Sequence, residues 1–171
     1  MSRKFGPIFQ SGYVVADWEQ AARHWIERLG VGPFFVLRHV EFAECYYRGA
    51  PTAADLTVAI AYSGDHQIEL VQQHNDAPSI YTEFLTRAPY GLQHVGALTD
   101  DLDRSLDETG LRDRRIQWGV TRAGQRFAYV DTCLHEGTML ELIEADRAML
   151  DAFAHMQAAA RDWDGSKPIR G

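Results

Sequence analysis

Apolar and polar residues alternate along residues 8–16, with the two-residue period of a β-strand that buries one face. From residue 18 to residue 29 the period changes, and apolar residues recur at i, i+3, i+4 and i+7. This spacing predicts an amphipathic helix. Asp17 stands at the N-cap position of that helix, with Gln20 three residues later, and Gly30 stands just beyond its end. The chain therefore opens with a strand followed by a helix.

The rest of the first half has the character of extended chain. Residues 34–42 form one extended segment, and two clear strands follow at 56–62 and 67–72, separated by a Ser-Gly-Asp turn. The first half is thus predicted to have the order βαβββ.

The same order recurs in the second half. A short helix follows Pro78 and ends before Pro89, and a strand is expected over 92–99. Asp101 then caps a shorter helix that Gly110 ends. The remaining expected elements are strands at 115–121, 127–132 and 138–144, a helix at 145–161 and a mobile tail at 162–171.

These patterns predict an α+β fold made of paired βαβββ modules. Their strands should form a curved mixed sheet of roughly eight strands that encloses a cleft, with the helices outside. The expected boundaries are 1–74 for the first module, 75–91 for a linker with a short helix, 92–144 for the second module, and 145–171 for a C-terminal helix and tail.

Two stretches of sequence look like copies of each other. Residues 10–17 align with 94–101, and residues 68–72 align with 140–144. In this alignment Gln10 pairs with His94, and Glu69 pairs with Glu141. A duplicated fold with one polar group at each of four equivalent points can build a four-ligand metal site, so Gln10, Glu69, His94 and Glu141 are the predicted metal ligands.

The donor set indicates the chemistry of such a site. It combines an amide oxygen, two carboxylates and an imidazole, without sulfur, and zinc, manganese, nickel, cobalt, iron or magnesium would accept it. Four protein ligands leave two octahedral positions for substrate, and the metal would act as a Lewis acid on a carbonyl. The expected reaction removes a proton next to the metal-bound carbonyl and gives an enolate. Glu141 is the first choice for the catalytic base and Glu69 the second.

Composition and charge exclude some classes of binding partner. The net charge of −7 and the scarcity of Lys argue against nucleic-acid binding, and the longest apolar stretches are too short for a membrane span. Two cysteines without a CxxC motif predict a reduced, cytoplasmic protein in which Cys45 and Cys133 are buried and inert. Five aromatic residues have two open interpretations, as cleft lining or as ordinary core: Tyr46, Tyr47, Trp118, Phe127 and Tyr129.

The chain resembles the vicinal oxygen chelate superfamily, which includes glyoxalase I, methylmalonyl-CoA epimerase, extradiol dioxygenases and bleomycin-resistance proteins. The resemblance rests on residues 10–17, 67–70, 93–96 and 139–142 and extends to about residue 144. It implies a glyoxalase-like fold with metal ligands at the four positions named above. The order Gln, Glu, His, Glu is similar to that of zinc-type glyoxalase I, whose last Glu is the base, and this makes zinc the first choice.

The resemblance leaves two functional hypotheses. The first is a metal-dependent isomerase, epimerase or lyase that acts on a small organic substrate. The alternative is a non-catalytic small-molecule binding protein, like the drug-resistance members of the superfamily. The residues that bind glutathione in glyoxalase I have no convincing match, and the two-His, one-Glu set of extradiol dioxygenases is not supplied. A homodimer is expected, because the superfamily commonly pairs modules.

Overall fold

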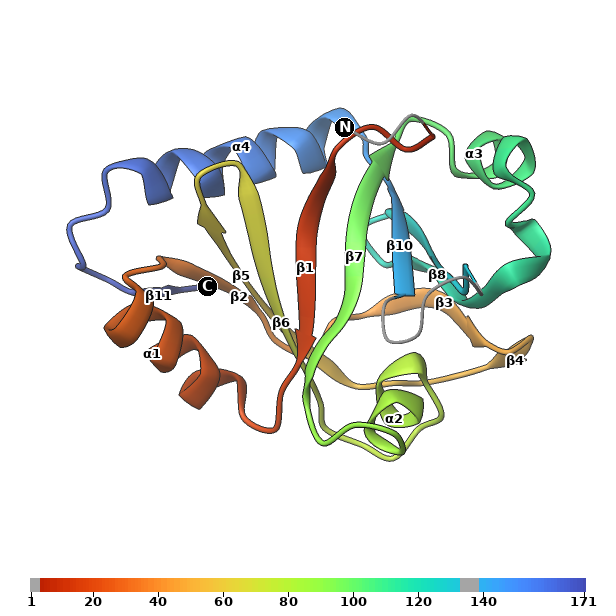
Figure 1. Ribbon diagram of the computed structural model, residues 1–171, viewed down its shortest axis with the longest axis horizontal. Coiled ribbons are helices and arrows are strands. Elements are labelled where there is room, and N and C mark those ends of the chain that lie inside the picture. Colours follow the sequence, from red (N-terminus) through yellow and green to blue (C-terminus); the bar gives the residue numbers. More distant parts are fainter. Residues whose placement is uncertain (1–3, 133–138) are drawn as a thin grey trace.

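The computed structural model describes residues 4–132 and 139–171, and in these ranges eleven strands form one mixed, open sheet with four α-helices (Figure 1). In chain order the elements are β1 (Ile8–Val14), α1 (Trp18–Leu29), β2 (Phe34–Leu37), β3 (Phe42–Tyr47), β4 (Ala50–Pro51), β5 (Leu56–Ser63), β6 (His66–Gln73), α2 (Ile80–Leu85), β7 (Gly91–Thr99), α3 (Leu102–Thr109), a 3-10 turn (Arg112–Arg114), β8 (Arg115–Thr121), β9 (Arg126–Val130), β10 (Met139–Glu144), α4 (Arg147–Arg161) and β11 (Ile169–Arg170). None of the described helices is long and apolar enough to cross a bilayer.

The sheet has two halves with the same topology. Its strand order is β11-β2-β5-β6-β1-β7-β10-β9-β8-β3-β4. In the first half β1 lies parallel to β6, β6 is antiparallel to β5, and β5 is antiparallel to β2. In the second half β7 lies parallel to β10, β10 is antiparallel to β9, and β9 is antiparallel to β8. The halves meet where β1 and β7 run antiparallel in the middle of the sheet (Figure 1). The predicted pair of βαβββ modules is confirmed.

The two strand-to-helix junctions are built alike. The Asp17 carboxylate accepts a hydrogen bond from the backbone N–H of Gln20, and Asp101 caps α3 in the same way. Gly30 and Gly110 end the helices in the left-handed conformation, at φ 66° and 69°, which glycine adopts without the strain of a side chain. The predicted caps are therefore correct at both ends of both helices.

The helices divide the sheet into two faces. Trp18 and Ala22 of α1 pack on Leu70, while Leu106 of α3 packs on Leu142. Side chains alternate between faces along a strand, so α1 and α3 cover the face opposite to Glu69 and Glu141.

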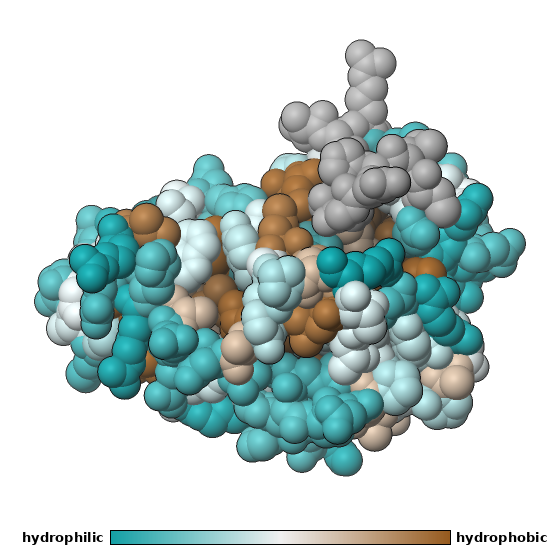
Figure 2. Space-filling view, turned by 60° about the horizontal axis from the view of Figure 1, so that its bottom comes forward, coloured by the Kyte–Doolittle hydropathy of each residue, from teal (hydrophilic) through white to brown (hydrophobic). Residues whose placement is uncertain are grey.

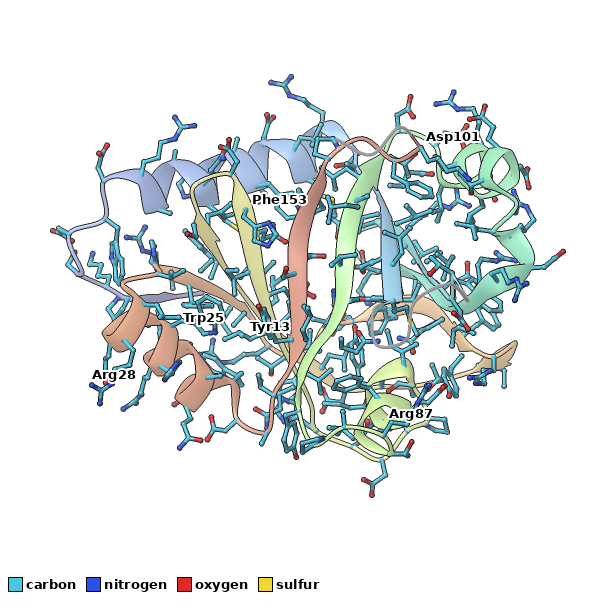
Figure 3. All side chains as sticks on the ribbon, viewed as in Figure 1. Tyr13, Trp25, Arg28, Arg87, Asp101 and Phe153 are labelled. Carbon is cyan, nitrogen blue, oxygen red and sulfur yellow. The ribbon has the colours of Figure 1, made fainter. Side chains whose placement is uncertain are left out.

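The other face is covered by α2 and α4. Ile80 and Tyr81 of α2 pack with Val14 of β1 on the face that carries the two glutamates. In Figure 1, α2 lies at the lower end of the central strands and α4 runs along their upper end. Phe153 of α4 contacts Phe9 of β1 with ring centroids 5.9 Å apart (Figure 3).

The prediction of roughly eight strands was too low, because the β3–β4 hairpin and the terminal strand β11 were missed. Residues 42–51 leave the first module and form β3 and β4, and β3 pairs with β8 in the second module. Cys45 lies opposite Gly119, and Tyr46 stacks on Trp118 at 5.6 Å between ring centroids. Nothing in the local alternation of residues 34–47 indicates a strand partner so distant along the chain.

The prediction of a mobile tail at 162–171 was wrong. Ile169 and Arg170 form β11 and pair in parallel with Phe34 and Phe35 at the edge of the sheet. The ring of Trp163 packs where a side chain on Gly32 would stand, and its Nε1–H donates to the Ser166 carbonyl at 2.7 Å. The tail therefore extends the sheet instead of leaving it.

The expectation of buried, inert cysteines holds for Cys45. It is 5% exposed, and burial raises its pKa to about 11 despite an opposing backbone hydrogen bond. Its thiol therefore stays protonated near neutral pH and is a poor nucleophile. Cys133 lies outside the described residues.

We predict that Leu142→Ala lowers the free energy of unfolding by about 2–5 kcal/mol, because Leu142 is fully buried beneath α3 and the truncation leaves a cavity. Leu29→Ala is the control, since Leu29 is 55% exposed and should cost less than about 0.5 kcal/mol. Urea unfolding followed by circular dichroism measures both. Equal losses in the two variants would contradict this assignment of the core.

Candidate metal centre

Two rows of paired residues cross the centre of the sheet at the junction of the modules. In one row, Gly12 of β1 lies between Glu69 of β6 and His94 of β7. In the other, Gly96 of β7 lies between Gln10 of β1 and Glu141 of β10. The rows are related by the same pseudo-twofold symmetry as the modules, so each half contributes one carboxylate and one further polar side chain to the same face.

Glycine at the two central positions makes room for the neighbouring side chains. A Cβ atom on Gly12 would overlap the imidazole ring of His94, and a Cβ atom on Gly96 would overlap the amide of Gln10. Each polar side chain therefore lies directly over the glycine of the neighbouring strand. The two glycines occupy equivalent positions in the duplicated sequence, but the alignment alone does not indicate this role.

The polar atoms converge within a few ångströms. His94 Nε2 is 3.1 Å from Glu69 Oε2 and 3.4 Å from Glu141 Oε2. One ligand atom from each of these three residues lies within 4.8 Å of the other two. All are buried: His94 is 0% exposed, Glu141 6% and Glu69 8%, and Gln10 beside them is 1% exposed. The four residues singled out from the sequence thus lie together.

Four buried atoms at this point have no hydrogen-bond partner among the described residues: Gln10 Oε1, Glu69 Oε2, His94 Nε2 and Glu141 Oε2. The contacts of His94 with the two glutamates reach ion-pair distance but lack the direction of a hydrogen bond. Buried polar atoms without a partner each cost on the order of 1–3 kcal/mol. Four such atoms in one place indicate a binding site for a ligand that contacts all of these atoms. A cation fits this site because each of the four atoms can donate an electron pair.

The amide of Gln10 is oriented by a short chain of hydrogen bonds. Its Nε2–H donates to Gln67 Oε1 at 2.7 Å, and Gln67 Nε2–H donates to the Tyr62 hydroxyl at 2.7 Å. With its nitrogen engaged in this way, the oxygen of Gln10 lies over Gly96, which is the neighbour of Glu141 in the sheet. Gln67 and Tyr62 were not predicted, although Gln67 stands two residues before Glu69 and so shares its face.

The imidazole of His94 is also oriented by a neighbour. Its Nδ1–H donates to Gln93 Oε1 at 2.8 Å, because an amide oxygen can only accept. The neutral imidazole then carries its free electron pair on Nε2, the atom that faces the two glutamates. Gln93 reaches His94 because the pairing of β1 with β7 shifts register between Gly12 and Tyr13. No local pattern in the sequence predicts this irregularity.

Burial and close charges perturb the titration of the cluster. Burial alone would lower the pKa of His94, but contacts with Glu141 and Glu69 outweigh it and raise that pKa to about 9. Burial raises the pKa of Glu69, and the neighbouring Glu141 charge adds to this while His94 opposes it. Without a cation, His94 is therefore an imidazolium ion between two carboxyl groups near neutral pH.

One face of the molecule is hollowed near its middle, and hydrophobic side chains gather there between more polar surroundings (Figure 2). Two of the aromatic residues that the sequence offered as cleft lining, Phe127 and Tyr129, have different surroundings. Phe127 belongs to the buried cluster beneath α2, whereas the ring of Tyr129 also meets the His94 ring edge-on at 5.1 Å between centroids.

The fold is similar to that of solved structures of low sequence identity. A methylmalonyl-CoA epimerase from Mycobacterium tuberculosis matches with a TM-score of 0.59 and 18% identity, over 88% of this chain and 95% of that one. A hypothetical protein from Bacillus halodurans matches with a TM-score of 0.57 and 16% identity, over 82% and 94%. A second methylmalonyl-CoA epimerase, with selenomethionine, matches with a TM-score of 0.54 and 19% identity, over 84% and 97%.

No curated protein sequence matches the chain. The family model of the Glyoxalase/Bleomycin resistance protein/Dioxygenase superfamily matches residues 9–130, which is most of the sequence. Together with the paired βαβββ modules, this match identifies the chain as a member of that superfamily, the vicinal oxygen chelate proteins.

Proposed function

We propose that the protein is a metal-dependent enzyme of the isomerase or epimerase type, which moves a proton at a carbon next to a carbonyl group. The observation that carries the proposal is the convergence of four buried donor atoms without hydrogen-bond partners, from Gln10, Glu69, His94 and Glu141. Similarity of fold to two methylmalonyl-CoA epimerases supports a reaction of this class, while the substrate itself is left open.

The donor set fits a divalent cation in charge as well as in geometry. Two carboxylates, a neutral imidazole and an amide oxygen carry a total charge of −2, which a divalent ion balances. An unbalanced pair of buried carboxylates would cost several kcal/mol, so the balance is a strong reason for metal binding. Zinc remains our first choice for this oxygen and nitrogen set, with manganese, nickel, cobalt, iron and magnesium as alternatives.

The residues of the chain would supply the proton transfers. A bound divalent ion would act as a Lewis acid toward the negative charge that develops on the carbonyl oxygen. Glu141 is our choice for the base that takes the proton from the adjacent carbon, because it stands at the last ligand position, which is the base in the zinc-type glyoxalase I that the ligand order resembles. Glu69, on the pseudosymmetric side, is then available to return a proton to that carbon.

Metal binding requires a proton to leave His94. In the metal-free protein the imidazole holds this proton tightly, since its pKa is raised to about 9 by the two glutamates. A cation can use the Nε2 electron pair only after the proton has gone, so cation and proton compete for the same position.

We predict that the protein purified without chelator contains one divalent ion per chain, and that Glu141→Gln retains the ion but loses catalysis. The test reaction is exchange of hydrogen for deuterium in D2O, followed by NMR, with a panel of 2-oxo and 2-hydroxy carbonyl compounds and acyl thioesters. Loss of the general base should slow exchange by about 10²–10⁴-fold.

Glu44→Gln is the control for this experiment, because Glu44 is an exposed carboxylate on β3 and its loss should leave exchange unchanged. Full activity of Glu141→Gln would refute the role of Glu141. A protein that takes up no metal, and returns a bound compound unaltered, would instead be the non-catalytic binding protein of our alternative hypothesis.

We predict that Gly12→Ala weakens metal binding, since the added methyl group overlaps the His94 ring and forces it away from the glutamates. Disturbing the orientation of this ligand should lower the affinity for zinc by about 10–100-fold, as measured by competition with a chromophoric chelator. Ser11→Ala is the matched control, because Ser11 is the neighbouring residue on the opposite face of β1. Equal affinities in the two variants would argue against His94 as a ligand.

We predict that the metal-free protein loses stability as the pH rises from about 6.5 to 9. The folded protein holds the His94 proton more tightly than the unfolded chain, so the proton stabilises the fold below pH 6.5 and this contribution disappears as the pH approaches 9. The loss should be on the order of 3 kcal/mol. Urea unfolding at several pH values in the presence of chelator measures it, and His94→Gln should lack this part of the pH dependence.

A further inference from the structure

A pair of buried tyrosine hydroxyl groups lies beside the candidate metal centre and has no part in the function proposed above. The hydroxyl oxygens of Tyr81 on α2 and Tyr129 on β9 are 2.9 Å apart and hydrogen-bonded to each other. Tyr81 is 3% exposed and Tyr129 4%, so neither hydroxyl relies on bulk water. Each hydroxyl group therefore has one partner, but a hydroxyl group can both donate and accept, so the single bond between them does not use all of their hydrogen-bonding capacity.

The two tyrosine hydroxyl groups have one O–H donor more than the hydrogen bond between them uses. Two hydroxyl groups carry two O–H donors, and one of them is consumed between the two oxygens. No described residue other than these two accepts from either hydroxyl, and the glutamate oxygens that face the centre are themselves without a partner. One O–H donor is thus left over in a buried position.

Tyr129 lies beside the centre. Tyr129 is paired in register with Glu141 across β9 and β10, and its ring meets the His94 ring edge-on at 5.1 Å between centroids. At the pseudosymmetric position on the other side of the site, Ile60 is paired with Glu69. The two carboxylates therefore differ in their neighbours, because only the Glu141 side has a hydroxyl group there.

We propose that Tyr129, with its own oxygen accepting from Tyr81, donates a hydrogen bond to the oxygen of the substrate that becomes negatively charged during the reaction. Tyr129 would be a further catalytic residue, and Tyr81 a positioning residue behind it. This inference rests on the proposed function, because it assumes a carbonyl substrate held between Glu69, His94 and Glu141.

The electrostatic surroundings suit a neutral donor. Burial raises the pKa of both tyrosines well above the usual value, and the charges of Glu141 and Glu69 raise them further. These shifts favour the neutral, protonated form of both hydroxyl groups, which is the form that donates a hydrogen bond. A hydrogen bond from one hydroxyl to the next also polarises the second O–H, which strengthens its donation to an anionic acceptor.

The test uses the zinc-loaded protein and acetohydroxamate, a small ligand that presents an anionic oxygen to a metal site. We expect Tyr129→Phe to raise the acetohydroxamate dissociation constant by about tenfold to a hundredfold in isothermal titration calorimetry, the loss typical of a hydrogen bond to a charged group. Tyr81→Phe should have a smaller effect, and the double variant should match Tyr129→Phe. Zinc affinity should be unchanged in all three.

Two controls separate donation from a structural role. Imidazole binds zinc as a neutral ligand without an oxygen, so its affinity should be equal in the wild type and in Tyr129→Phe. Tyr46→Phe removes a hydroxyl on the outer edge of the sheet and should leave acetohydroxamate binding unchanged.

The outcomes distinguish this inference from the proposed function. Wild type and Tyr129→Phe with equal acetohydroxamate affinity would overturn the inference alone, as would a loss confined to Tyr81→Phe or an equal loss of imidazole binding. A wild-type protein that takes up no metal would overturn the proposed function, and this inference with it.

Discussion

The site depends on the antiparallel register between β1 and β7, because these two strands bring the modules together. Gln10 lies opposite Gly96 and Gly12 opposite His94, so each polar side chain has a glycine beneath it. A shift by one residue would turn every side chain of one strand to the other face and would separate the four donor atoms. The apolar contacts of α1 and α3 on the opposite face oppose such a shift, because they fix which side of each strand is buried.

The same geometry makes the site a local source of instability. Two glutamates and a histidine converge in a buried position, where the partnerless oxygens and the mutual repulsion of the carboxylates oppose folding. The protein tolerates this because apolar clusters pack on both faces of the sheet and hold the strands in place. Unfavourable folding free energy that is localised in this way is typical of functional sites, and binding of the ligand removes it.

The duplicated pattern made the fold and the four central residues predictable. Strand periodicity, the Asp17 and Asp101 caps and the repeated glycine after each polar residue are local signals, so the sequence carries them directly. The β3–β4 hairpin and β11 were missed because their pairing partners are far away along the chain. The residues that orient the predicted ligands were missed for a related reason. Gln93 contacts His94 only because of a register irregularity, and Tyr62 contacts Gln67 from a neighbouring strand.

The two modules differ in the residues that surround their equivalent site side chains. Gln67 orients Gln10, but the equivalent position in the second module is Met139, and His94 is oriented instead by Gln93. A symmetric site would offer two equal carboxylates to the substrate and would not favour either face. Different neighbours make the glutamates unequal, with Ile60 on one side and a hydroxyl group on the other. The two carboxylates can therefore take different roles in a proton transfer, because one lies beside an apolar side chain and the other beside a hydroxyl group.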